Sequence, residues 1–163
     1  MSNETFSNKV YVAEFFFTSC PTICPRMKTQ LLRVYNAFKD NPEVLFLSHT
    51  LDPVHDSVPV LREYAQRLNI SNSKWHLVTG DREKIYDLAQ NHYLITASQS
   101  SLADRSVIHS GAFILIDQKG AVKGLYDSTS EKEIDRMMQD MNKIVTSKNY
   151  FTRIRTNHLA DKF

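Results

Sequence analysis

Apolar positions recur along the chain in two alternating patterns. Short runs rich in Val, Ile, Leu, Phe and Trp are apolar at nearly every position and predict strands buried on both faces. These runs cover residues 9–17, 43–51, 75–79, 112–116 and 121–126. Elsewhere apolar residues return at every third or fourth position, which predicts amphipathic helices near residues 27–39, 57–68, 81–93 and 134–145.

The order of these elements indicates one α/β domain. Strands and helices alternate until residue 112, where two strands joined by a turn at Asp117–Gly120 precede the last helix. That order predicts a thioredoxin-like fold, a central mixed β-sheet flanked by helices on both faces, with its site at the carboxyl ends of the strands. We expect this domain at residues 9–146, a disordered or trimmed segment at 1–8 and a polar tail at 147–163.

The composition is that of an ordinary globular protein and argues against several functions. Hydrophobic residues make up 42% and charged residues 23% of the 163 positions, and the formal net charge is +2. So small a charge, without a basic stripe interleaved with aromatics, argues against nucleic-acid binding. No apolar run approaches the length of a membrane span, and the first residues do not resemble a signal peptide. The sequence therefore predicts either a cytosolic protein or a mature or trimmed form.

The chemistry of the chain is concentrated in its only two cysteines, Cys20 and Cys24. Both follow the first predicted strand, and each precedes a proline. Pro25 suits the first turn of the next helix, so we expect Cys24 near the helix N-terminus, where the helix dipole lowers the pKa of a thiol. Two inert, buried cysteines are disfavoured, because paired cysteines at a helix N-terminus are typically reactive.

Two kinds of chemistry remain open for this pair. The thiols could cycle between dithiol and disulfide, or bind a soft metal ion such as Cu(I) as thiolates. Redox motifs of the thioredoxin type place two residues between the cysteines, whereas three residues separate Cys20 from Cys24. The longer loop widens the distance between the sulfurs and favours a metal, without deciding between the two.

A copper site with two sulfur ligands usually includes a nitrogen ligand. The chain has six histidines, and His109 is the strongest candidate, because it follows a long polar loop and precedes the fourth predicted strand. In a thioredoxin-like topology that position faces the cysteine loop. His55, in the turn after the second strand, ranks second. The other four are expected to be structural or exposed: His49, His76, His92 and His158.

Together these motifs resemble those of the Sco/SenC family of copper-binding, thioredoxin-like proteins. The resemblance covers about residues 9–145 and rests on Cys20-Pro21-x-x-Cys24-Pro25, Asp52-Pro53-x-x-Asp56 and His109-Ser110. It implies a copper ion, Cu(I) or Cu(II), bound by Cys20, Cys24 and His109. Asp52 and Asp56 match the family's acidic turn beside the site, and Asp56 or Ser57 is also expected to cap the helix that follows.

The resemblance also implies a role and a location. It predicts a copper chaperone that helps deliver copper to, or mature, the Cu-A site of cytochrome c oxidase. The partners would be the oxidase subunit that carries this site and, as further candidates, other copper chaperones. The full-length protein would be anchored at the periplasmic side of the bacterial inner membrane, with the mitochondrial inner membrane, facing the intermembrane space, as the second choice.

Two departures from the family's pattern stand out. Ile108 replaces the aspartate usual before the ligand histidine, which removes a carboxylate that could tune copper affinity. The family's N-terminal hairpin region and membrane anchor are missing, which suggests a trimmed chain.

Two alternatives to copper delivery use the same cysteines. A thiol–disulfide oxidoreductase that reduces the cysteines of a partner protein would need only Cys20 and Cys24. In an oxidoreductase, replacing His109 would have little effect on activity. In a copper-binding protein, the same replacement would weaken copper binding. Peroxide reduction is a weaker alternative, because a proline after each cysteine is not typical of a peroxidatic site.

Overall fold

The computed structural model describes residues 3–20, 23–93 and 111–160 of the chain. Within these ranges, five strands form one sheet in the order β3-β2-β1-β4-β5. The strands are β1 (Val10–Phe16), β2 (Val44–Thr50), β3 (Trp75–Val78), β4 (Ala112–Ile116) and β5 (Val122–Asp127). The first three run parallel, while β4 is antiparallel to β1 and to β5. The predicted mixed sheet is confirmed.

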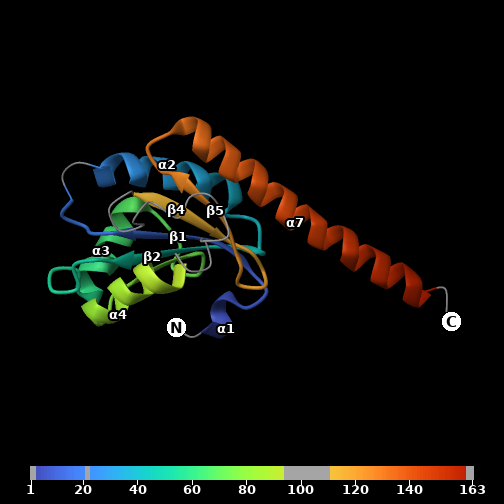
Figure 1. Ribbon diagram of the computed structural model, residues 1–163, viewed down its shortest axis with the longest axis horizontal. Helices are drawn as coiled ribbons and strands as arrows, with labels where there is room; N and C mark the ends of the chain where they lie inside the picture. The colour runs from blue at the N-terminus through green and yellow to red at the C-terminus, as the bar shows by residue number, and fades with distance from the viewer. Residues whose placement is uncertain (1–2, 21–22, 94–110, 161–163) are drawn as a thin grey trace.

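Helices cover both faces of this sheet, as the sequence predicted (Figure 1). They are α1 (Asn3–Phe6), α2 (Ile23–Phe38), α3 (Val58–Leu68), α4 (Arg82–Asp87), the π-helical turn η1 (Leu88–His92) and α7 (Glu131–Ala160). Apolar residues of α2, α3 and α7 pack on one face against Val10 and Val12. On the other face, α4 and η1 pack against Ala13 and Phe15. Alternate residues of β1 therefore belong to two cores, which explains why this strand is apolar at nearly every position.

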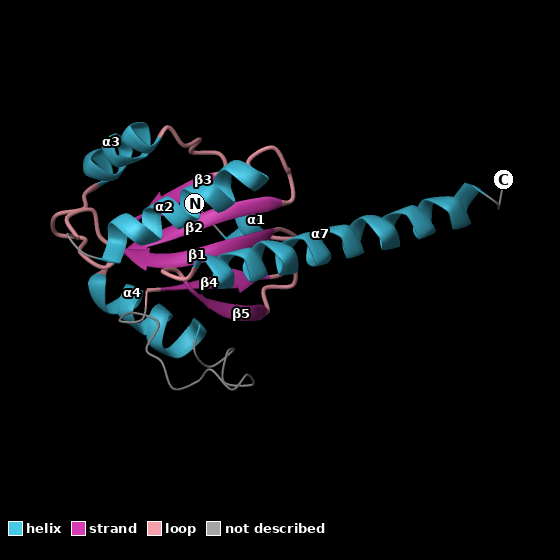
Figure 2. Ribbon diagram, turned by 90° about the horizontal axis from the view of Figure 1, so that it is seen from above, coloured by secondary structure: helices cyan, strands magenta, loops and turns pink. Residues whose placement is uncertain are grey.

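The two ends of the chain differ from their predicted structure. The sequence predicts a disordered or trimmed segment at residues 1–8; within it Asn3–Phe6 form α1, and the ring of Phe6 lies 4.9 Å from that of Tyr11. The sequence also predicts a polar tail from residue 147, whereas α7 continues as a helix to Ala160 and extends past the sheet (Figure 1 and Figure 2). No glycine or proline interrupts residues 147–160, so a helix nucleated on the sheet can propagate. The domain boundaries themselves stay predictions.

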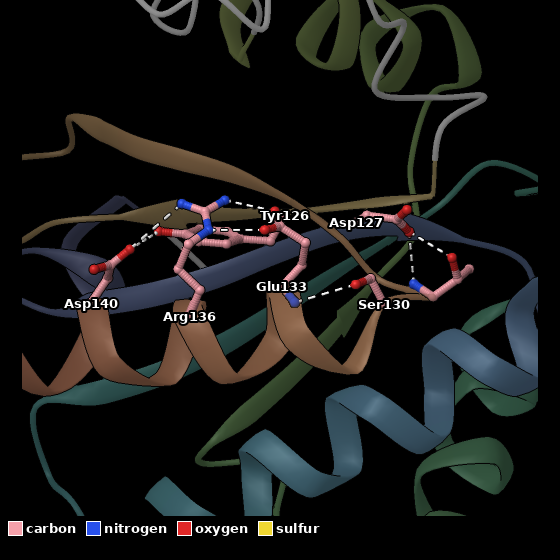
Figure 3. A network of polar contacts seen from close by, with 7 residues as sticks. Tyr126, Asp127, Ser130, Glu133, Arg136 and Asp140 are labelled. Carbon is pink, nitrogen blue, oxygen red and sulfur yellow. Dashed lines mark hydrogen bonds and ion pairs between the residues drawn. The ribbon is translucent and has the colours of Figure 1, made fainter.

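A polar network joins α7 to β5 (Figure 3). The hydroxyl of Tyr126 donates a hydrogen bond to Oδ2 of Asp140 at 2.8 Å, and the guanidinium of Arg136 lies 4.4 Å from the centre of the Tyr126 ring. Arg136 in turn donates from Nη2 to Oε2 of Glu133 at 2.7 Å. The backbone N–H of Glu133 donates to Oγ of Ser130, which caps the start of α7. These contacts hold the Tyr126 ring between α7 and the sheet.

Gly124 lies under this ring, and a side chain there is expected to destabilise the fold. A Cβ at position 124 would lie 2.7 Å from the hydroxyl oxygen of Tyr126, a residue that is 1% exposed. We expect Gly124→Ala to lower the free energy of unfolding by about 1–3 kcal/mol, because the ring must shift away from Asp140 and Arg136. Urea denaturation measures this. Gly80→Ala is the matched control, since a Cβ there meets nothing within 4 Å. Equal losses in the two variants would contradict the prediction.

Candidate metal and redox site

The cysteine loop connects the carboxyl end of β1 to the start of α2. The backbone N–H of Cys20 donates to the carbonyl of Phe17 at 3.3 Å, which turns the chain just after the strand. Helix α2 begins at Ile23, so Cys24 and Pro25 lie in its first turn, as predicted. Neither cysteine is in a disulfide, both are half-buried, and their side chains are hydrogen-bonded to each other. The loop thus brings two sulfur atoms together at the edge of the sheet.

The predicted lowering of the Cys24 pKa is wrong. The pKa of the Cys24 thiol is raised to about 12, chiefly by burial, with smaller contributions from its hydrogen bond to Cys20 and from the negative charges that Cys20 and Glu14 carry when ionised. The backbone of Phe17 opposes these effects only in part. A helix dipole contributes about 0.3–1 kcal/mol at a surface position, which is too little to offset the desolvation of a half-buried thiolate. A soft metal ion that displaces the thiol proton would still stabilise the thiolate.

Asp56 fastens the cysteine loop to the end of β2. Its side chain is completely buried, and its Oδ2 accepts hydrogen bonds from the N–H of Thr18 at 3.0 Å and from the hydroxyl of Thr50 at 2.5 Å. The hydroxyl of Thr18 also donates to Oδ1. Of the two predicted caps, Asp56 is wrong, because Ser57 occupies the N-cap of α3, although its side chain makes no capping hydrogen bond. The carboxylate turns instead toward the threonines at the carboxyl edge of the sheet.

Asp52 begins the same turn and is paired with His55. Its backbone N–H donates to Oγ1 of Thr50 at 3.0 Å, and its carbonyl accepts from the N–H of Asp56 at 2.9 Å. Its carboxylate Oδ2 lies 2.7 Å from Nδ1 of His55. The two aspartates of the acidic turn therefore have different environments: Asp56 is an internal anchor, whereas Asp52 is half-buried and holds an exposed imidazole.

A buried carboxyl group that the motif reasoning missed lies beneath the site. Glu14, on the α2 face of β1, is 5% exposed and accepts a hydrogen bond from the hydroxyl of Ser48 at 2.6 Å. Ser48 itself accepts from Nε1 of Trp75 at 2.8 Å. Burial raises the pKa of Glu14 to about 7. The available signal was a lone acidic residue inside an otherwise apolar strand.

The predictions for the individual histidines have different outcomes. His109, the predicted third ligand, and its neighbour Ile108 lie outside the described residues. Strand β4 begins at Ala112 and runs antiparallel to β1, so the chain enters it at the end of the sheet where β1 ends (Figure 2). The four predicted to be structural or exposed follow that expectation where the structure describes them: His49 is buried, His76 is half-buried and His92 is exposed.

Within the described ranges, no three His, Cys, Asp or Glu side chains lie close enough to hold a metal ion. Two adjacent, half-buried thiols fit part of a soft-metal site, because thiolate sulfur is the ligand type that Cu(I) prefers. The same two thiols could form a short disulfide loop. The geometry of the described residues therefore supports both kinds of chemistry that the sequence left open.

Comparison with known proteins settles the family. A family model described as SCO1/SenC matches residues 1–146. The chain belongs to the SCO1/SenC family. The resemblance found from the cysteine, aspartate and histidine motifs is thereby confirmed. A curated member, the SCO1 protein homolog of Bacillus subtilis (strain 168), is 27% identical over 91% of this chain and 77% of its own length.

Solved structures of SCO1/SenC proteins share the fold. A SCO1/SenC family lipoprotein from Bacillus anthracis superposes with a TM-score of 0.73 and is 29% identical, covering 89% of this chain and 86% of its own. BsSco, described as a member of the Sco family of cytochrome c oxidase assembly proteins with a disulfide switch, gives a TM-score of 0.69 at 26% identity over 87% of this chain and 83% of its own. The predicted thioredoxin-like fold is confirmed by these neighbours.

The predicted metal is found in another member of the family. The structure of ScoI from Arabidopsis thaliana, with copper bound, superposes with a TM-score of 0.64 at 21% identity, covering 88% of each chain. At this identity the similarity shows the fold alone. Among the described residues of this SCO1/SenC protein, no helix has the length and apolar content that crossing a membrane requires.

Proposed function

We propose that this SCO1/SenC protein carries copper as cargo on Cys20, Cys24 and His109 and delivers it to, or helps to mature, the Cu-A site of cytochrome c oxidase. The observation that carries the proposal is the pair of reduced thiols in mutual contact at the carboxyl edge of the sheet. Two soft sulfur ligands select Cu(I) over harder cations, and an imidazole completes a three-ligand site. The family membership supports copper as the metal.

The partner and location follow from the same proposal. The recipient would be the oxidase subunit that carries the Cu-A site, and other copper chaperones would supply the metal. BsSco is described as belonging to a family of oxidase assembly proteins, and the Bacillus anthracis relative is a lipoprotein. These descriptions support a membrane-anchored full-length protein, which we place at the periplasmic side of the bacterial inner membrane.

Anaerobic titration with Cu(I) tests the proposal. We expect one copper ion per chain, bound in competition with a chromophoric chelator. Cys24→Ser should abolish stoichiometric binding because it removes one of two sulfur ligands, and His109→Ala should weaken binding by about tenfold or more. His92→Ala, at an exposed position on η1, is the matched control. If the wild-type protein takes up no stoichiometric copper, the proposal is wrong.

A thiol–disulfide oxidoreductase is the second candidate, because the two thiols already lie in contact. In that reaction Cys20 and Cys24 form a disulfide, and the two electrons and two protons that they lose reduce a disulfide of the partner to a dithiol. The two candidates can coexist, since copper ligands of the cysteine type must be reduced before they bind metal. His109→Ala separates them: it should leave the exchange rate unchanged while it weakens copper binding.

A further inference from the structure

Next to the cysteine site, the turn after β2 presents an imidazole that a carboxylate orients. His55 is 76% exposed, and its Nδ1 lies 2.7 Å from Oδ2 of Asp52. An ionised carboxylate only accepts hydrogen bonds, so the proton of the neutral imidazole belongs on Nδ1. That tautomer leaves the lone pair on Nε2. Metal-binding histidines have this arrangement, in which a carboxylate fixes the tautomer and the orientation of the ring.

The turn that carries this pair is itself held in place. Asp52 is anchored through its N–H to Oγ1 of Thr50, and its carbonyl accepts the N–H of Asp56. The carbonyl of His55 accepts from the N–H of Ser57 at 3.0 Å. These backbone bonds close the turn on both sides of the imidazole. The exposed ring therefore stands on an ordered backbone.

The same turn is fastened to the cysteine loop. Asp56, the residue after His55, binds both the N–H and the hydroxyl of Thr18, which lies two residues before Cys20. Figure 1 and Figure 2 both place the loop after β1 and the turn after β2 at the same end of the sheet. His55 is thus positioned on the rim of the cysteine site, although it does not form a three-ligand cluster with other described residues.

We infer that His55 is an exchange ligand for copper, which binds the ion transiently through Nε2 while it passes to or from Cys20 and Cys24. The inference rests on the proposed copper cargo. A single imidazole with no further ligands in the described structure holds copper weakly, which suits a ligand that must release it. During loading, a Cu–Nε2 bond forms as the donor's ligand leaves. Sulfur then replaces the imidazole nitrogen, and each thiol proton leaves to solvent. Asp52 acts as a positioning residue.

Rates of copper transfer test this inference apart from copper affinity. Apo protein is mixed anaerobically with Cu(I) as its acetonitrile complex, and uptake is followed by the ultraviolet absorption of the copper–thiolate bonds. Release is followed with the chelator bathocuproine disulfonate. We expect His55→Gln to slow both rates by about tenfold and to leave the stoichiometry and the equilibrium affinity unchanged. Asp52→Asn should slow them less, because the imidazole remains but loses its orientation.

The chain offers a matched control for these variants. His92 is also exposed and lies 3.5 Å from a carboxylate, that of Asp87, but on η1 and through Nε2. His92→Gln should keep wild-type rates. Wild-type rates in His55→Gln would overturn the inference, as would a loss of affinity without a change in the uptake rate. If wild-type protein shows no copper binding at equilibrium, the proposed function fails, and the inference fails with it.

A second measurement does not depend on the loaded cysteine site. In the Cys20→Ser/Cys24→Ser variant, a small amount of Cu(II) should broaden the NMR signals of residues 52–56, because a paramagnetic ion relaxes the nuclei nearest to it. Adding His55→Gln to this variant should abolish the broadening. Broadening that is unchanged by His55→Gln would overturn the inference, because the ion would then be bound elsewhere.

Discussion

Asp56→Ala is expected to lower the free energy of unfolding by about 3–5 kcal/mol, because it removes the acceptor for three donors. The donors are the N–H and hydroxyl of Thr18 and the hydroxyl of Thr50, and the Asp56 side chain is completely buried. Thr50 is completely buried, so its hydroxyl cannot reach water without opening the site, whereas Thr18 is half-buried. Desolvation of these donors, rather than the loss of packing, accounts for most of the cost.

Urea denaturation of Asp56→Ala measures this cost, and two variants calibrate it. Asp56→Asn keeps the shape and one acceptor oxygen but places an amide against donors, so we expect a smaller loss. Asp52→Ala removes a half-buried carboxylate from the same turn, and we expect it to cost less than about 1 kcal/mol. A comparable loss in Asp52→Ala and Asp56→Ala would contradict the assignment of Asp56 as the anchor.

Loss of this anchor should also be visible at the cysteine loop. Thr18 lies two residues before Cys20, and its N–H donates a hydrogen bond to Asp56. Exchange of this amide therefore reports whether Asp56 still binds the loop. We expect hydrogen exchange of the Thr18 amide to accelerate in Asp56→Ala more than that of amides in the centre of β1. Protection at Thr18 that falls only in step with global stability would mean that the loop is held by other contacts.

The strands and helices could be predicted from the sequence because each depends on a local pattern. The apolar runs of β1 and β4 match buried strands, and Pro25 marks the first turn of α2. The hairpin turn that ends in Gly120 follows the same logic, since Gly120 has a positive φ of 80°. These features belong to residues near one another in the chain, which is the range in which sequence patterns are informative.

The properties of the site depend on distant residues and were predicted less well. The pKa of Cys24 is set mainly by burial and by the neighbouring Cys20, with a smaller contribution from Glu14 ten residues earlier, rather than by its place in the helix. Asp56 binds Thr18, which is 38 residues away, and the local turn pattern suggested only a cap. The sequence nevertheless revealed the cysteine pair, the acidic turn and the family, because a motif is recognised from its residue types even where it does not reveal their contacts.

Glu14→Gln is expected to remove a pH dependence from the stability of the protein. The pKa of Glu14 is raised from 4.5 to about 7 by burial. Below the lower value the carboxyl group is protonated in both states. As the pH rises from 4.5 to about 7, Glu14 ionises in the unfolded chain before it ionises in the folded protein. The folded state therefore loses about 3 kcal/mol of stability relative to the unfolded state across this range. Glutamine is neutral throughout and can still accept the hydrogen bond from Ser48, so this loss should disappear.

His49 acts in the opposite sense and hides the effect in the wild-type protein. Burial lowers the pKa of His49 from 6.5 to about 4, so the unfolded state takes up the proton first as the pH falls, and stability is lost on acidification through that window. Between 4.5 and 6.5 the two contributions oppose each other. The wild-type profile should therefore be nearly flat there, while that of Glu14→Gln should rise with pH.

The decisive measurement is the difference in unfolding free energy between Glu14→Gln and wild type, taken by urea denaturation at several pH values from 4 to 8. Any part of this difference that does not vary with pH reflects the replacement of the carboxyl group by an amide. We expect the difference to grow in favour of the variant by about 3 kcal/mol as the pH rises across the window of Glu14. Glu83→Gln, at an exposed position in α4, accounts for the loss of one negative charge from the chain. A difference that stays constant with pH would show that Glu14 ionises in the folded protein as it does in the unfolded chain. The cysteine site would then have no neutral, buried carboxyl group beneath it.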